Sequence, residues 1–449
     1  MKKRLSFPEM IAVGSMLFGL FFGAGNLIFP VFMGQSAGSN VWPAAIGFLI
    51  TGVGIPLLGV ASIGMSKSDG LFEMTARFLG RGYSLFFTCI LYLTIGPFFA
   101  IPRCASTSFS VGIAPMISDK TEKWFIWIFA LLFFAAVLFF SLRPGKILTW
   151  VGKILTPLFL LSLGILIVAA LISPIGDYSA VKPQDAYASN ALFKGFIEGY
   201  NTMDALAGLA FGIVVVDSIR RLGVTEPTHI AGNTIRSGIF GCVIMAVIYV
   251  MLALVGAGSG TVSADGGEAL NLVATHYFKD AGGIVLAVIV TLACLKTAVG
   301  LITSCGEMFC QMFPKGPSYK VWAIGFCIIS FLISTVGLNA IIAWSLPVLM
   351  FLYPLAMTLI ILVLCGNLFE NDRAVFVSVT IFTLIPSIID LVAALPYGLP
   401  EKAFFAAIVR VGKYLPLSNI GLSWVCPAAA GLIIGIIVHI IKKVANKQK

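Results

Sequence analysis

The sequence predicts an all-α polytopic membrane protein with about twelve transmembrane helices. Its 449 residues are 59% hydrophobic and only 11% charged, with a mean hydropathy of +1.03, whereas a soluble globule carries roughly 25% charged residues. Apolar stretches long enough to cross the bilayer recur along the whole chain. Two of these stretches are interrupted by glycine and polar residues, which predicts broken helices.

Twelve apolar stretches are the expected membrane spans, and most of them reach the ~20 residues that a crossing helix needs. The stretches cover residues 8–33, 41–65, 84–115, 124–141, 147–172, 190–216, 231–258, 282–312, 319–337, 341–366, 373–395 and 418–441. A short additional helix is expected within residues 395–417.

The loop after the second span is typical of an interfacial helix over residues 69–82. Asp69 is placed to cap its start, and two glycines follow its last apolar residue. Phe72, Ala76 and Leu79 would share one face, which we expect to be the apolar face of this helix.

The net charge of +10 would suggest nucleic-acid binding in a soluble protein, but the positions of the basic residues explain it better. With both termini in the cytoplasm, most of the 29 Lys and Arg residues fall in cytoplasmic segments. The opposite side holds Lys120, Lys123, Lys182, Lys279, Lys402, Arg410 and Lys413. We therefore expect a multi-pass protein of the cell (inner or plasma) membrane, surrounded by the lipid bilayer and without a nucleic-acid partner. The sequence carries no signal for an oligomeric state.

The first helix is expected to stay uncleaved, because Lys2, Lys3 and Arg4 precede an apolar run without a small-x-small cleavage site.

The composition also disfavours several functional classes. Nine cysteines, all within spans, form no disulfide framework, and three distant histidines offer no metal site. The sequence lacks the acid clusters and Ser/His or Cys/His pairs of membrane enzymes and the filter-like loop of a channel. We expect one membrane transport domain over residues 1–449, without enzyme activity or a cofactor.

The first span is interrupted near its middle by Gly23, Ala24, Gly25 and Asn26. At ~1.5 Å per residue, the segment from Met10 to Gly23 runs roughly 20 Å, at or somewhat past mid-bilayer. Freed backbone groups at that depth are costly unless they face protein or a ligand. A helix-packing motif is the alternative, but glycines at i and i+2 do not share a face. We favour an unwound site that offers amides to an anion and carbonyls to a cation, as a secondary transporter needs.

The sixth span carries a second interruption. Residues 198–204 are polar and contain glycine, whereas residues 205–212 are small and apolar. The first and sixth spans open two sets of five, and paired interruptions at matching positions point to an inverted-repeat transporter with a site at mid-membrane. The expected repeats cover about 8–172 and 190–366, followed by extra helices over about 373–441.

Asp204 and Lys296 are charged residues deep within spans, where charge is costly and functional by default. Asp204 would bind a substrate ammonium, a coupling cation or a proton; the alternative is a structural ion pair with Arg103. Lys296 lies near the middle of its span, and its alternative is to snorkel to the interface. A lysine supplies donors only, so it would take the place of a cation rather than bind one.

The remaining polar residues in the spans carry weaker signals. Thr202 and Thr297 stand beside the features above, whereas most membrane hydroxyls bond to their own helix backbone. Glu198 lies nearer a span edge, which favours a structural or gating role, and Arg103 is given the same role. Phe21 and Phe22 flank the first break and would line an apolar pocket.

Four motifs, in order along nearly the whole chain, resemble one known family. Residues 18–30, FGLFFGAGNLIFP, resemble the first-helix signature of the branched-chain amino acid:cation symporters (BrnQ-type, LIVCS). Residues 96–103, 198–206 and 293–301 carry motifs similar to those of the same family. The resemblance implies a LeuT/APC-type fold with a 5+5 inverted repeat. It also implies cation-coupled uptake of leucine, isoleucine and valine, normally with Na⁺.

The first break also resembles that of the neurotransmitter-sodium-symporter group. This resemblance implies that the amides of Ala24 and Gly25 bind the substrate carboxylate. It implies a Na⁺ site built from Gly19, Phe22, Ala293 and Thr297. Lys296 falls where a further hydroxyl ligand would sit. Its ammonium would then replace Na⁺, as a lysine does in some proton-coupled relatives, unless a one-residue shift turns it elsewhere.

These features together predict a secondary active symporter that imports branched-chain amino acids with Na⁺ or H⁺ by alternating access. The expected substrate-binding residues are Phe22, Gly23, Ala24, Gly25, Asn26, Thr202 and Asp204. The expected cation-binding or cation-replacing residues are Gly19, Phe22, Ala293, Lys296 and Thr297. A cation-independent exchanger or facilitator of the same fold is the alternative, and an intramembrane enzyme is disfavoured.

Overall fold

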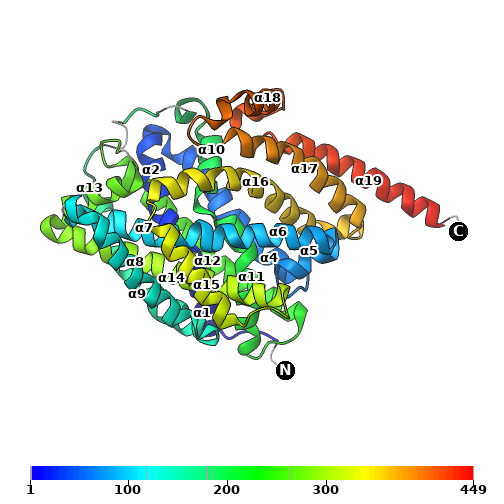
Figure 1. Cartoon of the computed structure of the whole chain (residues 1–449), viewed down its shortest axis with the longest axis horizontal. Helices are drawn as coiled ribbons and strands as arrows, with labels where there is room; N and C mark the ends of the chain where they lie inside the picture. The colour runs from blue at the N-terminus through cyan, green and yellow to red at the C-terminus, as the bar shows by residue number, and fades with distance from the viewer. Residues whose placement is uncertain (1–2, 118, 178–180, 185, 264, 448–449) are drawn as a thin grey trace.

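Helix occupies most of each expected span in the computed structural model, which describes residues 3–117, 119–177, 181–184, 186–263 and 265–447 (Figure 1). No strand occurs within these ranges. The α-helices are α1 Phe7–Phe21, α2 Ala24–Ala37, α3 Val41–Leu49, α4 Ile55–Met65, α5 Leu71–Leu79, α6 Arg81–Leu93, α7 Ala100–Gly112, α8 Asp119–Ser141, α9 Thr156–Ile172, α10 Ala186–Glu198, α11 Asp204–Arg221, α12 Pro227–Ala257, α13 Gly266–Phe278, α14 Gly282–Met312, α15 Tyr319–Ser334, α16 Leu338–Leu364, α17 Arg373–Ala393, α18 Ala403–Gly412 and α19 Val425–Lys447.

Nine helical segments of the described residues are long and apolar enough to cross a membrane, or ten when the bent α10–α11 pair is counted as one span. The count differs from twelve for two reasons. The chain from Ala24 to Met65 is one continuous helical segment, so it joins parts of the first two expected spans. The helices Phe7–Phe21 and Tyr319–Ser334 are apolar but short. Twelve crossings therefore stay a prediction.

The first expected helix is broken, but the break is shorter than Gly23–Asn26. Phe22 (φ −74°, ψ 89°) and Gly23 (φ −114°, ψ −152°) leave helical geometry, and α2 begins at once with Ala24. The Asn26 side chain explains the early restart, because its Oδ1 accepts from the Gly23 N–H at 3.0 Å. Such a bond satisfies a donor that has no partner within the helix.

The sixth expected helix is also broken. After α10, residues Gly199–Thr202 form a 3₁₀ turn, and Met203 adopts the left-handed conformation (φ 66°) before α11 begins at Asp204. The two helices are bent by 42° at this point. Both breaks predicted from the sequence are therefore present in the fold.

Two short helices outside the spans match their expected positions. The helix expected within 395–417 is confirmed by α18, and the one expected within 69–82 is confirmed by α5. The predicted cap of α5 was wrong, because Asp69 pairs with Arg220 at 2.5 Å instead. Its predicted face was also displaced, since α5 buries Leu71, Met74, Thr75, Phe78 and Leu79 against neighbouring helices.

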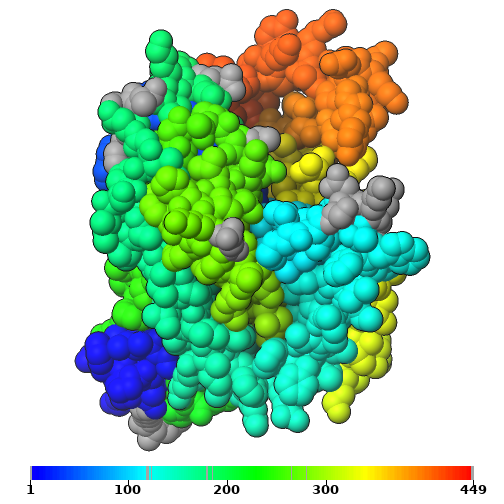
Figure 2. Space-filling model, turned by 90° about the vertical axis from the view of Figure 1, so that its left-hand side faces the viewer, coloured from blue at the N-terminus to red at the C-terminus, as the bar shows by residue number. Residues whose placement is uncertain are grey.

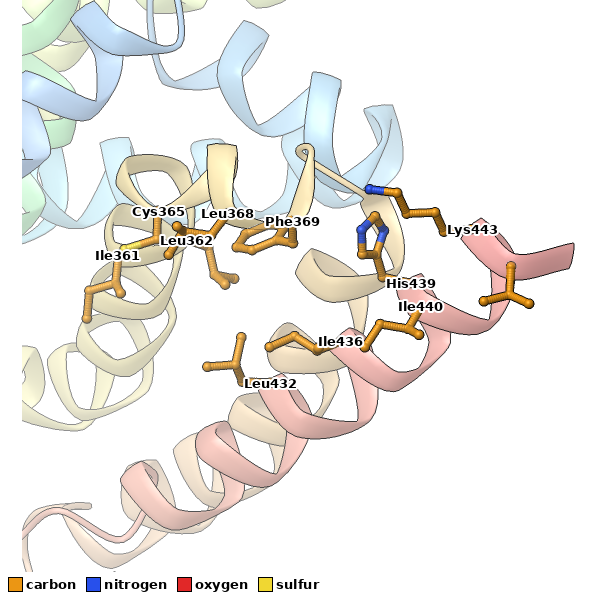
Figure 3. A pocket seen from close by; sticks show the side chains of 11 residues that line it. Ile361, Leu362, Cys365, Leu368, Phe369, Leu432, Ile436, His439, Ile440 and Lys443 are labelled. Atoms are coloured by element: carbon orange, nitrogen blue, oxygen red, sulfur yellow. The ribbon is translucent and has the colours of Figure 1, made fainter. Parts of the chain in front are cut away.

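The last helix, α19, packs along α17 and projects furthest from the rest of the molecule (Figure 1). Asp372 joins the two helices: it caps α17 at the Ala374 N–H and contacts His439 at 2.9 Å. These two contacts hold the pKa of Asp372 below its usual range. A cavity of about 510 Å³ lies between α16 and α19, lined mainly by aliphatic side chains (Figure 3). None of the predicted site residues lines it.

Helix α13 packs on α2, the helix that follows the first break, and on α7 and α14. The approach is close: a Cβ on Gly267 would lie 2.6 Å from Val111 Cγ2 of α7. Figure 2 shows this green segment at the surface, beside the cyan residues of α8. Helices α1 and α2 also pack on α12 and α14, which buries the first break.

Helix α1 packs closely against α12, and a substitution at this contact tests it. A Cβ on Gly241 would lie 2.7 Å from the Gly14 carbonyl oxygen, whereas a Cβ on Gly232 of the same helix would meet nothing within 4 Å. Gly241→Ala should destabilise the protein by about 1–3 kcal/mol through overpacking. Gly232→Ala should leave it unchanged or stabilise it by up to ~1 kcal/mol. Thermal unfolding in detergent measures both, and equal melting temperatures would contradict the tight contact.

Candidate functional site

A small buried cavity lies where the two helix breaks face α7 and α14. Its volume is about 20 Å³, room for roughly one water molecule. The lining includes nine residues singled out in the sequence: Phe21, Gly23, Ala24, Gly25, Asn26, Arg103, Thr202, Asp204 and Thr297. The remaining lining is Leu20, Ile95, Ala100, Cys104, Met203, Ala207, Phe211 and Leu301. Polar groups from both breaks therefore share one cavity with an apolar wall.

Asp204 sits at the centre of a buried hydrogen-bond network. Its Oδ2 accepts from Asn26 Nδ2 at 2.6 Å and from the Tyr249 hydroxyl at 2.7 Å. Asn26 Nδ2 also contacts the Tyr249 hydroxyl. All three residues are at most 2% exposed. The network joins α2, α11 and α12 across the two breaks.

Arg103 and Asp204 line the same cavity but do not form the ion pair considered as an alternative. Within the described residues, Arg103 donates to the carbonyls of Asn201 at 2.8 Å and Thr202 at 3.4 Å. Its guanidinium lies 5.6 Å from the Phe29 ring centre. Asp204 is held by the neutral donors Asn26 and Tyr249 instead. The pairing hypothesis is therefore wrong for this state of the protein.

Lys296 is fully buried and does not snorkel. Its Nζ donates to the Phe22 carbonyl, and to the Gly19 carbonyl at 3.3 Å. Thr297 Oγ1 donates to the same Gly19 oxygen at 3.3 Å. The ammonium also lies 4.3 Å from the ring centre of Phe159 on α9, a distance at which a cation is attracted to an aromatic face. Lys296 thus fastens the end of α1 to α14.

Three other predicted site residues do not line the cavity. Ala293 is buried on α14, one turn before the Lys296 contacts, and does not line the cavity. Phe22 faces away from the cavity toward Phe18, Phe159 and Tyr249. Glu198 pairs with Lys194 at 3.2 Å and accepts from Asn201 Nδ2 at 3.1 Å.

Thr202 and Phe21 both line the cavity, beside the helix breaks. Thr202 Oγ1 bonds back to the Gly199 carbonyl at 2.8 Å and accepts from the Asp204 N–H at 3.3 Å. Phe21 packs against Phe211, with ring centres 5.6 Å apart, on the apolar side of the cavity. The hydroxyl of Thr202 thus supports the start of α11.

We did not identify Tyr249, Phe159 or the apolar lining residues Ala207 and Phe211 from the sequence. Tyr249 gave one signal, a phenol in the middle of an apolar span. Ala207 and Phe211 follow Asp204 at i+3 and i+7, the spacing of one helix face. Phe159 gave no signal, because only tertiary packing brings α9 under Lys296.

The chain is similar in sequence to several curated transport proteins. A family model described as branched-chain amino acid transport protein matches residues 6–442. A branched-chain amino acid permease from Lactobacillus delbrueckii subsp. lactis is 51% identical, with 95% of this chain and 96% of the relative covered. One from Bacillus subtilis (strain 168) is 40% identical, with 98% and 99% covered. A branched-chain amino acid transport system 2 carrier protein from Pseudomonas aeruginosa is 37% identical, with 96% and 95% covered.

The fold is also similar to that of a solved transporter. A nucleobase-cation-symport-1 family transporter, solved in a closed conformation with a hydantoin bound, aligns with a TM-score of 0.57 at 14% identity. The alignment covers 98% of this chain and 93% of that structure. This likeness concerns the LeuT-like fold alone. The family model and the curated relatives, which match almost the full length, show that the chain belongs to the branched-chain amino acid transport protein family.

Proposed function

We propose that the chain is a secondary active symporter that imports branched-chain amino acids by alternating access. The observation that carries this proposal is the single cavity that combines two helix breaks, a buried carboxylate and an apolar wall. The names of the relatives support leucine, isoleucine and valine as substrates. A cell-membrane location with cytoplasmic termini follows from the distribution of basic residues.

In this proposal, Asp204 binds the substrate ammonium. Asp204 is ionisable, buried and held only by neutral donors in the described structure, so a cationic partner would complement it. The amides of Ala24 and Gly25 begin α2, where helix N–H groups lack intrahelical partners and favour an anion. Phe21, Phe211 and other apolar lining residues would then receive the aliphatic side chain.

The substrate can enter only if the surrounding helices move. The cavity of about 20 Å³ has room for roughly one water, which is far too little for an amino acid. We propose that two repeats of five helices, over about 8–172 and 190–366, rock against each other around the breaks. Twelve crossings, with extra helices over about 373–441, complete this proposed architecture.

We further propose that the coupling ion is H⁺, carried by Lys296. Na⁺ prefers oxygen ligands, and the carbonyls of Gly19 and Phe22 already accept from the lysine ammonium. The same oxygens cannot hold Na⁺ and the ammonium together. Loss of the proton would remove the positive charge from these hydrogen bonds and weaken the contact between α1 and α14, so protonation biases the conformational equilibrium.

Uptake by proteoliposomes tests the coupling proposal. A pH gradient without Na⁺ should drive accumulation of labelled leucine, and a Na⁺ gradient without a pH gradient should not. Lys296→Met should reduce accumulation to the level of simple equilibration, because the proton carrier is gone. Lys194→Met, which removes a partly exposed lysine in α10, should leave accumulation unchanged.

Three results would overturn parts of this proposal. Absence of both uptake and leucine binding would contradict the transporter itself. Strong Na⁺-driven uptake that persists in Lys296→Thr would exclude the lysine as proton carrier. Leucine entry that needs only leucine on the opposite side, without either gradient, would instead support the cation-independent exchanger.

The hydrogen bond from Tyr249 should tune the affinity of Asp204 for substrate. Tyr249→Phe removes one of two donors to Asp204 Oδ2, and hydrogen bonds to charged groups are worth ~1.5–3 kcal/mol. We expect leucine affinity to fall by about 10- to 100-fold, measured by equilibrium binding in detergent. Tyr187→Phe is the matched control, because the buried Tyr187 hydroxyl has no hydrogen-bond partner in the described part of the chain. Equal affinities for the two variants would contradict the role of the network.

A further inference from the structure

Arg103 is a buried cation whose hydrogen-bonding capacity is only partly used. It is 4% exposed and lies on α7, beside both helix breaks. Its two Nη atoms donate to the carbonyls of Asn201 and Thr202, and its Nε has no hydrogen-bond partner among the residues that the structure describes. Within the described residues it forms no ion pair. A guanidinium has five N–H donors, and unmatched buried donors and charge are costly.

The guanidinium also faces the place where a substrate would lie. Arg103 lines the cavity together with Asp204 and the start of α2. Its Nη2 would lie 3.0 Å from a Cβ on Gly25, so it approaches the backbone that opens α2. Gly25 permits this approach because it has no side chain. The guanidinium and the first amides of α2 therefore lie at one anion-attracting corner of the cavity.

From this geometry we propose that Arg103 binds the carboxylate of the amino acid substrate. A cavity with an unpaired buried guanidinium and a separate buried carboxylate, Asp204, is complementary to a zwitterion. The Nε edge of an arginine can engage a carboxylate with two parallel hydrogen bonds. Arg103 then acts as a specificity residue that rejects amines without a carboxylate. This inference rests on the proposed function and deepens it.

A purely structural role for Arg103 makes a different prediction. The bonds to Asn201 and Thr202 satisfy carbonyls at the end of the unwound segment before α11. If that were their whole purpose, loss of Arg103 would weaken binding of every ligand of the cavity equally. A carboxylate-binding role weakens only ligands that carry the carboxylate. Comparison of leucine with leucinamide, which keeps the ammonium and the side chain, separates the two roles.

The experiment measures binding of leucine and leucinamide to the full-length protein in detergent. Wild type should bind leucine much more tightly than leucinamide. Arg103→Gln should lower leucine affinity about 10- to 100-fold and change leucinamide affinity less than about 3-fold, so that the preference disappears. Arg410→Gln, an exposed substitution on α18, should preserve the wild-type preference.

Each other outcome is informative. Equal losses for both ligands, or a wild-type preference retained in Arg103→Gln, would overturn the inference. If Arg103→Gln does not fold, Arg103→Lys decides: the charge is kept but the two-pronged geometry is lost, so leucine affinity alone should fall about tenfold. If wild type binds no branched-chain amino acid at all, the proposed function fails rather than this assignment.

Discussion

The constraint on which the site depends is the break between α1 and α2 inside a buried bundle. Backbone groups freed there have no water to bond, so side chains must satisfy them. Lys296 and Thr297 donate to the carbonyls at the end of α1, and Asn26 accepts from the Gly23 N–H. Because these partners come from α14 and from α2 itself, the break is held in place by tertiary contacts together with a local cap.

The same partners make the site electrostatically asymmetric. The Lys296 ammonium lies at the C-terminal end of α1, where the free carbonyls of the helix carry partial negative charge. The ring of Phe159 also faces this ammonium. On the other side of the break, Asp204 is held by Asn26 and Tyr249. Arg103 and Asp204 stay apart although both line one cavity. Two opposite charges that stay separate within a membrane protein would be complemented by the zwitterionic substrate that we propose.

The fold was predictable to the extent that hydropathy and glycine placement determine it. Hydropathy located the helices, and the segments Gly23–Asn26 and 198–204 marked the breaks. The early restart of α2 was not predictable, because it depends on an Asn26 side-chain cap. The capping role given to Asp69 failed for a related reason: an arginine distant in sequence, Arg220, takes its carboxylate. Side-chain partners across the bundle, such as Tyr249 and Phe159, need the tertiary structure.

The two charged groups proposed for coupling and for substrate meet at one short piece of backbone. Lys296 bonds the carbonyl of Phe22, and the Gly23 N–H that follows bonds Asn26, which in turn holds Asp204. A change in the protonation of Lys296 therefore changes its hydrogen bond to the Phe22 carbonyl. The same Phe22–Gly23 peptide unit is connected through Asn26 to the carboxylate of Asp204. Coupling between ion and substrate requires that each binds one arrangement of shared elements better than the other. The Phe22–Gly23 peptide, at the joint between two rigid helices, is an element that both can bias.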